Sequence, residues 1–171
     1  MKRLLAFAVA CSAAYALSQL PPFQPAPEMK LIAGFLGEWS GDFKLTAPGA
    51  PPTTMPAHVK EELYGGGVWH KTYYTMKAGN QVAFEGTSFM TWDAAKKKFK
   101  TYTFETGASE PRIEWGTFDG KKLINISEPH GGMVSRTTFE FVGADTLKFK
   151  IEFQDGDQWM TVGECTFKKK A

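Results

Sequence analysis

Ten short segments with the two-residue period of a β-strand follow one another along this chain of 171 residues. Turns rich in glycine separate them, and no long helical pattern interrupts the series. The first segment is centred on Trp39 and Phe43, and the others are predicted at 57–64, 68–77, 81–92, 98–105, 112–118, 121–127, 133–142, 146–154 and 158–168. Such a series is typical of an all-β domain. We expect an antiparallel up-and-down barrel of roughly ten strands, because closure pairs every strand edge.

A short helix is predicted ahead of the first strand, at residues 27–33. A proline begins it, which suits a first helical position, and Gly34 ends it because glycine readily adopts the left-handed conformation found after helices. Ile32 and Phe35 are spaced to lie on one apolar stripe. We expect the helix to plug one end of the barrel, with Trp39 as a structural residue at the barrel floor.

The stretch that contains this helix resembles the start of the bacterial DUF1579 family, and Gly37-Glu38-Trp39 resembles the Gly-x-Trp motif of the calycin superfamily. The likeness continues at 84–86, 92–99 and 116–120 and covers nearly all of the predicted domain, 27–171. The resemblance implies a lipocalin-like barrel. It implies little about activity, because the family has no known function. More distantly, the barrel is similar to nitrobindin-like haem proteins, which implies haem as one cofactor to consider.

The first 16 residues are interpreted as a signal peptide. Two basic residues precede an apolar run too short to span a bilayer, and Ala14-Tyr15-Ala16 fits a cleavage site before Leu17. A proline-rich lead-in, 17–26, then precedes the barrel domain. Cys11 partly resembles a lipoprotein site but lacks the usual leucine three residues earlier. Simple export to the periplasm or the extracellular space is therefore favoured over a lipid anchor.

The predicted processing changes the charge of the chain. Removing the first 16 residues removes two basic residues and no acidic one, so the formal net charge falls from +2 to 0. A mature chain of this kind does not predict a nucleic-acid partner. It keeps a single cysteine, Cys165, so an intrachain disulfide is excluded. The sequence offers no membrane span, and closed edges suit a monomer or a homodimer.

Several strand faces mix aromatic side chains with His, Ser and Thr, which is typical of a cavity wall rather than a dry core. A barrel of about eight or more strands begins to leave room for a ligand. The residues expected to line the cavity are His70, Tyr74, Phe84, Ser88, Met90, Tyr102, Trp115 and Phe149. They predict non-catalytic binding of a small hydrophobic or amphipathic molecule.

Cofactor binding is a weaker alternative. Haem would need an axial imidazole, for which His70 and His130 are the candidates, although the chain has no CxxCH motif. No metal site is predicted, because the three histidines lack the spacing of metal ligands.

Two further alternatives concern the interior itself. An isomerase or cyclase would need a buried carboxylate able to move a proton. Glu85, Glu105 and Glu114 lie in predicted strands, but we expect them to face solvent, and a buried glutamate beside His70 or Arg112 would favour the enzyme. A structural envelope protein would instead have a fully packed interior.

Overall fold

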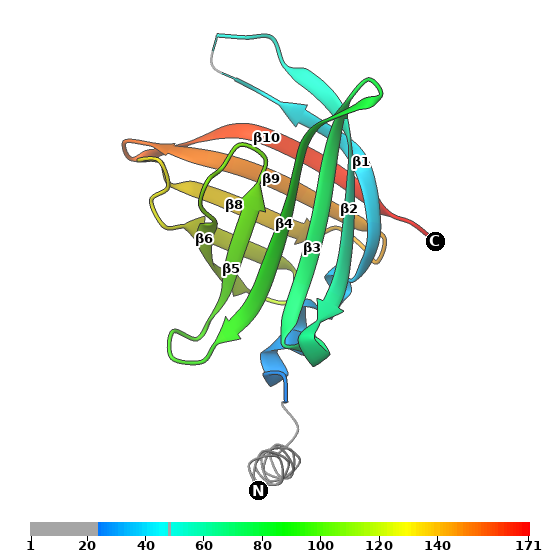
Figure 1. Ribbon diagram of the computed structural model, residues 1–171, viewed down its shortest axis with the longest axis vertical. Coiled ribbons are helices and arrows are strands. Elements are labelled where there is room, and N and C mark those ends of the chain that lie inside the picture. The colour runs from blue at the N-terminus through cyan, green and yellow to red at the C-terminus, as the bar shows by residue number, and fades with distance from the viewer. Residues whose placement is uncertain (1–23, 48) are drawn as a thin grey trace, which may run out of the picture.

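The structure is a computed structural model, and it describes residues 24–47 and 49–171. Over these residues ten antiparallel strands form one closed barrel, in which each strand pairs with its neighbours in sequence and β1 pairs with β10 (Figure 1). The strands are β1 (Gly37–Leu45), β2 (Thr53–Tyr64), β3 (Trp69–Ala78), β4 (Gln81–Asp93), β5 (Lys98–Glu105), β6 (Arg112–Phe118), β7 (Lys122–Ser127), β8 (Ser135–Phe141), β9 (Thr146–Asp155) and β10 (Gln158–Lys169). The predicted all-β barrel is confirmed.

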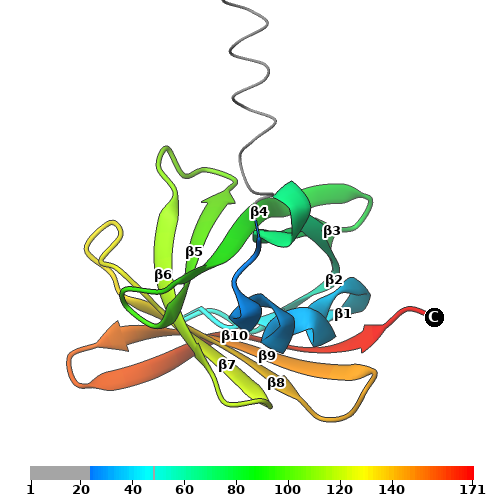
Figure 2. The same cartoon turned by 90° about the horizontal axis from the view of Figure 1, so that it is seen from below.

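The predicted helix is present as a 3-10 helix, η1 (Pro27–Phe35), and a second short one, η2 (Gly65–Gly67), joins β2 to β3. Met29, Ile32 and Phe35 are the buried residues of η1. Seen from below, η1 lies within the ring of strands at one end of the barrel (Figure 2). Its apolar side chains therefore close that end, as expected of a plug.

Trp39 joins η1 to the barrel. Its ring has no exposed surface, and its indole N–H donates a hydrogen bond of 2.7 Å to the carbonyl oxygen of Phe35, the last residue of η1. The ammonium group of Lys169 lies 5.1 Å from the centre of the ring, and Phe141 packs at 6.4 Å. Trp39 thus fills the floor of the barrel and also provides a hydrogen-bond donor for the last carbonyl of the plug helix.

A β-bulge in β10 changes which of its side chains face inward. The sequence pattern predicts one shared face for Trp159, Thr161, Cys165 and Phe167, but the register with β9 shifts between Thr161 and Gly163. An extra residue in one strand reverses the facing beyond it. Trp159 accordingly lies outside, with the guanidinium of Arg136 4.4 Å from its ring centre.

The other half of β10 stays in the interior. Phe167 belongs to the buried core, and Cys165 is buried beside it. Burial raises the pKa of the Cys165 thiol to about 12, so this thiol stays protonated and unreactive at neutral pH.

The predicted signal peptide, the site at Cys11 and most of the lead-in lie outside the described residues. In the part of the chain that is described, no helix combines the length and apolar character needed to cross a membrane.

Candidate functional site: the interior cavity

The barrel encloses a cavity of about 1000 Å³. It reaches the end of the barrel opposite η1, where Leu45, Ala47, Asp155 and Met160 line it at the turns. One side is almost entirely apolar and comes from β1, β9 and β10. We call this the apolar wall, and it consists of Phe43, Phe149, Ile151, Phe153, Val162 and Phe167. Glycine at position 163 lets the Phe43 ring lie directly against β10, because a side chain there would overlap it.

The opposite side carries polar groups from six consecutive strands, β3 to β8. We call it the polar wall, and it consists of Tyr74, Ser88, Thr103, Glu105, Arg112, Glu114, Asn125 and Thr137. An interior with one apolar and one polar side matches a ligand that is itself amphipathic.

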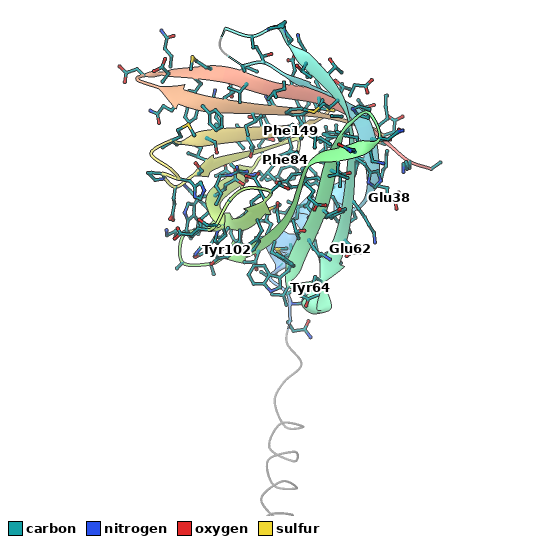
Figure 3. All side chains as sticks on the ribbon, turned by 45° about the horizontal axis from the view of Figure 1, so that its top comes forward. Glu38, Glu62, Tyr64, Phe84, Tyr102 and Phe149 are labelled. Atoms are coloured by element: carbon teal, nitrogen blue, oxygen red, sulfur yellow. The ribbon has the colours of Figure 1, made fainter. Side chains whose placement is uncertain are left out.

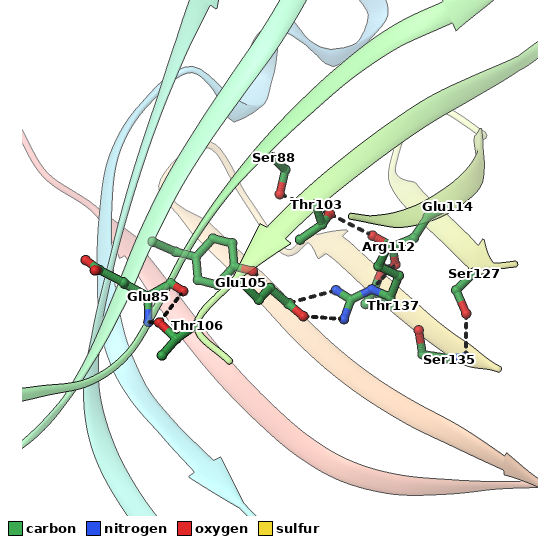
Figure 4. A network of polar contacts seen from close by, with 11 residues as sticks. Glu85, Ser88, Thr103, Glu105, Thr106, Arg112, Glu114, Ser127, Ser135 and Thr137 are labelled. Carbon is green, nitrogen blue, oxygen red and sulfur yellow. Dashed lines mark hydrogen bonds and ion pairs between the residues drawn. The ribbon is translucent and has the colours of Figure 1, made fainter. Parts of the chain in front are cut away.

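Arg112 is at the centre of the polar wall (Figure 4). Its two terminal nitrogens donate hydrogen bonds of 2.8 and 2.9 Å to the carboxylate of Glu105 on the neighbouring strand. Its Nε lies 3.8 Å from Oε1 of Glu114 on its own strand. The phenol of Tyr74 donates a further hydrogen bond of 2.8 Å to Glu105. Two carboxylates thus share one guanidinium.

Glu114 is the most deeply placed acid of this group, with 3% of its surface exposed. The hydroxyls of Thr103 and Thr137 donate to its carboxylate over 3.2 and 3.4 Å, and Asn125 in turn donates to Thr137 over 3.2 Å. Burial raises the pKa of Glu114, and the attraction of Arg112 only partly offsets this. Burial also works to lower the pKa of Arg112, but its carboxylate partners outweigh burial and raise that pKa.

Five of the eight residues predicted for the cavity line it: Tyr74, Phe84, Ser88, Met90 and Phe149. They come from β3, β4 and β9, and Figure 3 labels two of them, Phe84 and Phe149. Tyr74 and Phe84 stack on each other, with ring centres 6.1 Å apart.

Tyr102 and Trp115 lie on the outer face of the barrel, which corrects their expected placement. The ring of Tyr102 is 6.2 Å from that of Trp69 and has Lys100 above it at 4.8 Å. The indole N–H of Trp115 donates to Glu128 over 2.8 Å, and the ammonium of Lys96 lies 3.6 Å from its ring. The residues that alternate with these two, Thr101 and Thr103 on β5 and Glu114 on β6, line the cavity instead.

The glutamates predicted to face solvent divide into two kinds. Glu85 is exposed and accepts a hydrogen bond from Tyr73. Glu105 and Glu114 face the interior instead, since Arg112 and the threonines of neighbouring strands replace the water they lose. The expectation of solvent-facing charges is wrong for these two residues. The sequence does not predict their pairing, because pairing depends on strand register. The recurrence of polar residues at alternate positions from β5 to β8 is the signal that could have placed them inside.

His70 is fully buried and does not belong to the cavity lining. Its Nδ1 lies 3.0 Å from Oε2 of Glu61, which does line the cavity, and Phe35 packs edge-on at 6.4 Å. His130 is in the loop after β7, where its backbone pairs with Met133. Neither imidazole faces the cavity, so the arrangement does not fit an axial haem ligand from His70 or His130.

Glycine at position 86 leaves the space that the phenol ring of Tyr74 occupies beside β4. A Cβ at this position would overlap the Tyr74 phenol ring. We expect Gly86→Ala to push the phenol away from Glu105 and to lower the free energy of unfolding by about 1–3 kcal/mol, as overpacking does. Chemical denaturation measures this loss. The same change made in a Tyr74→Ala background should cost much less, and equal costs in both backgrounds would contradict the steric explanation.

The fold and its interior define a class, the closed ten-stranded barrel with an internal cavity. The sequence matches the family described as "Protein of unknown function (DUF1579)" over residues 24–169. The chain therefore belongs to the DUF1579 family, as the motifs around Trp39 predict. A search among curated proteins finds no match.

Solved structures of the same fold come from several organisms. Rv2717c from M. tuberculosis has a TM-score of 0.64 at 10% identity, over 86% of this chain and 100% of that one. The S-type phycobiliprotein lyase CPES from Guillardia theta has a TM-score of 0.58 at 9% identity, over 84% and 90%. A DUF3598 protein from Nostoc punctiforme PCC 73102 has a TM-score of 0.53 at 12% identity, over 86% of this chain and 51% of that one. At these identities the likeness shows a shared fold.

Proposed function

We propose that this protein binds a small amphipathic molecule inside the barrel without transforming it. The observation that carries the proposal is a cavity of about 1000 Å³ with the apolar wall facing the polar wall. This volume is at the upper end of ligand pockets, which span about 300–1000 Å³. The cavity also disfavours a structural protein with a packed interior.

Burial of ligand carbon would supply most of the affinity. Each methylene group moved from water to the apolar wall contributes about 0.8 kcal/mol before ordering costs are subtracted. A chain of about twelve carbons would then contribute on the order of 10 kcal/mol gross. The polar wall would fix the orientation of the head group.

Export belongs to the same proposal. With cleavage before Leu17, the mature barrel would work in the periplasm or outside the cell, as a monomer or homodimer that holds one small molecule. A carrier or sensor of poorly soluble molecules fits such a location.

Proton-transfer catalysis is a second candidate, favoured by one observation. Glu114 is buried next to Arg112, and burial raises its pKa. A carboxylic acid with a raised pKa can exchange a proton with a bound molecule near neutral pH. An isomerase or cyclase acting in this cavity would use Glu114 as that group. Turnover of a bound molecule that is abolished in Glu114→Gln would favour this candidate over simple binding.

A matched pair of substitutions on β4 tests the binding proposal. Ser88 lines the cavity, whereas its neighbour Thr87 lies outside the lining, on the alternate face of the strand. We expect Ser88→Phe to fill part of the cavity and to weaken binding of the neutral fluorophore N-phenyl-1-naphthylamine at least tenfold. Thr87→Phe should leave binding unchanged. Fluorescence titration measures both, with thermal melts to show that both variants fold. Equal binding by the two variants, or no binding by wild type, would contradict the proposal.

A further inference from the structure

The charged side chains that line the cavity are mostly acidic. The lining contains four carboxylates against one guanidinium, and among the described residues it contains no lysine: Glu61, Glu105, Glu114, Asp155 and Arg112. The one imidazole of the lining, that of His58, is engaged 3.3 Å from Glu38. The charges facing a bound molecule are therefore negative in sum wherever the acids are ionised.

The guanidinium of Arg112 is already paired with carboxylates of the protein. Both terminal nitrogens of Arg112 bind Glu105, and its Nε faces Glu114. An anionic head group at the polar wall would meet two carboxylates and an arginine whose charge they already balance. Like charges at short distance in a poorly solvated interior repel strongly. The polar wall therefore disfavours a fatty acid or any other anion.

Two buried polar atoms of the cavity lining have no hydrogen-bond partner. Oδ1 of Asn125 and the hydroxyl of Thr101 have no partner among the described residues, although 3% and 4% of these residues is exposed. Both residues line the cavity. Buried polar atoms in native proteins are nearly always paired. The amide oxygen of Asn125 can only accept, so its missing partner is a donor, supplied by the ligand or by water, whereas the hydroxyl of Thr101 can accept or donate.

Aromatic rings border this part of the cavity as well. Tyr74 and Phe84 stack and both belong to the lining. The face of an aromatic ring carries partial negative charge and attracts cations, above all where water is excluded. The rings, the unpaired amide oxygen of Asn125 and the excess of carboxylates all favour a cationic head group that donates hydrogen bonds.

We propose that the cavity binds cationic amphiphiles, molecules with a basic nitrogen head and an apolar tail. The head lies at the polar wall beside Glu114 and Glu105, and the tail lies against the apolar wall of β1, β9 and β10. The inference rests on the proposed function and names the ligand class of that same site. An ammonium head donates hydrogen bonds and carries a positive charge that offsets the excess of carboxylates.

Binding of such a molecule should be coupled to a proton. Burial raises the pKa of Glu114, and the groups that face it are Arg112 on its own strand, Glu105 on β5 and Tyr74 on β3, with hydroxyls from Thr103 and Thr137. A cation nearby favours the ionised carboxylate and lowers that pKa again. Affinity for a permanent cation should therefore rise with pH, and binding should release protons.

Three probes with the same twelve-carbon tail test the ligand class: dodecylammonium, dodecanol and dodecanoate. Each is titrated below its micelle-forming concentration against the wild-type protein loaded with N-phenyl-1-naphthylamine. We expect dodecylammonium to displace the fluorophore at a concentration at least tenfold lower than either other probe. The preference should grow between pH 5.5 and 8.5, a range in which this amine stays protonated. In weak buffer, dodecylammonium should release protons and dodecanol should not.

Variants then locate the head group. Glu114→Gln should remove most of the preference for the cation, whereas Glu85→Gln, on the outer face of β4, should keep it. Proton release by wild type needs no variant and tests the inference even if Glu114→Gln does not fold. Displacement by dodecanol or dodecanoate at equal or lower concentration would overturn the cationic class and leave the proposed function intact. Failure of the fluorophore and of all three probes to bind would overturn both.

Discussion

Replacing Arg112 by methionine should lower the free energy of unfolding by about 3 kcal/mol, the lower end of the range for breaking a buried ion pair. The side chain of Arg112 is 15% exposed, so some water reaches the pair and moderates the loss. Its removal leaves Glu105 and Glu114 facing each other without a counter-charge. Urea denaturation followed by tryptophan fluorescence measures the difference.

The loss should be larger at pH 8 than at pH 5. Burial raises the pKa of Glu114 above its ordinary value of 4.5, and Arg112 is the main charge that opposes this shift. Without Arg112 the pKa of Glu114 in the folded state rises further. Between the unfolded and the folded pKa, the folded state binds more protons than the unfolded state, so stability falls as the pH rises. The variant should therefore be relatively less impaired in acid.

A surface pair and a compensated variant control this experiment. Lys44 and Glu164 form an exposed ion pair across β1 and β10, at 3.4 Å, and Lys44→Met should have little effect because such pairs contribute little. Neutralising the polar wall as a whole, with Arg112→Met, Glu105→Gln and Glu114→Gln together, should recover most of the stability. A triple variant as unstable as Arg112→Met alone would show that packing, and not charge, explains the loss.

The architecture was predictable from local signals. Alternation along each strand and glycine at the turns predict the ten strands. The helical pattern before Trp39 predicts the plug at η1. Strand β9 shows why this works: Leu147, Phe149, Ile151 and Phe153 are apolar at every second position, so the inward face is unambiguous. The two-residue period of a strand predicts its inward face wherever only one of its faces is apolar.

The candidate site was harder to predict, because both faces of β5 and β6 mix aromatic and polar side chains. Hydrophobicity alone predicts that Trp115 and Tyr102 lie inside, yet they lie outside beneath lysines. Glu114 is inside because Arg112, Thr103 and Thr137 surround it, and two of these come from other strands. Pairing of this kind depends on register, which alternation alone does not give. The bulge in β10 likewise reverses which side chains face inward, and the alternation of the sequence does not predict it.

Replacing Trp39 by alanine should cost the barrel about 3–5 kcal/mol, as expected for a fully buried aromatic ring cut back to a methyl group. The ring is in the core cluster with Phe35, and its N–H is the partner of the Phe35 carbonyl at the end of η1. The variant therefore loses packing and the side-chain hydrogen bond that ties the end of the plug helix to β1. Urea denaturation gives the stability, and the neutral fluorophore should bind more weakly because the floor of the cavity loosens.

Two variants separate the contributions of Trp39. Trp39→Phe keeps most of the ring volume but removes the indole N–H, so it should lose about 1–2 kcal/mol, the cost of leaving the buried Phe35 carbonyl without its donor. Trp115→Ala removes an indole from the outer face and should cost far less than Trp39→Ala. Since Trp39 is hydrogen-bonded to the end of η1 and Trp115 lies on the outer face, fluorophore binding should weaken with Trp39→Ala and not with Trp115→Ala. A Trp39→Ala protein that unfolds at the wild-type urea concentration would show that η1 closes the barrel without this anchor.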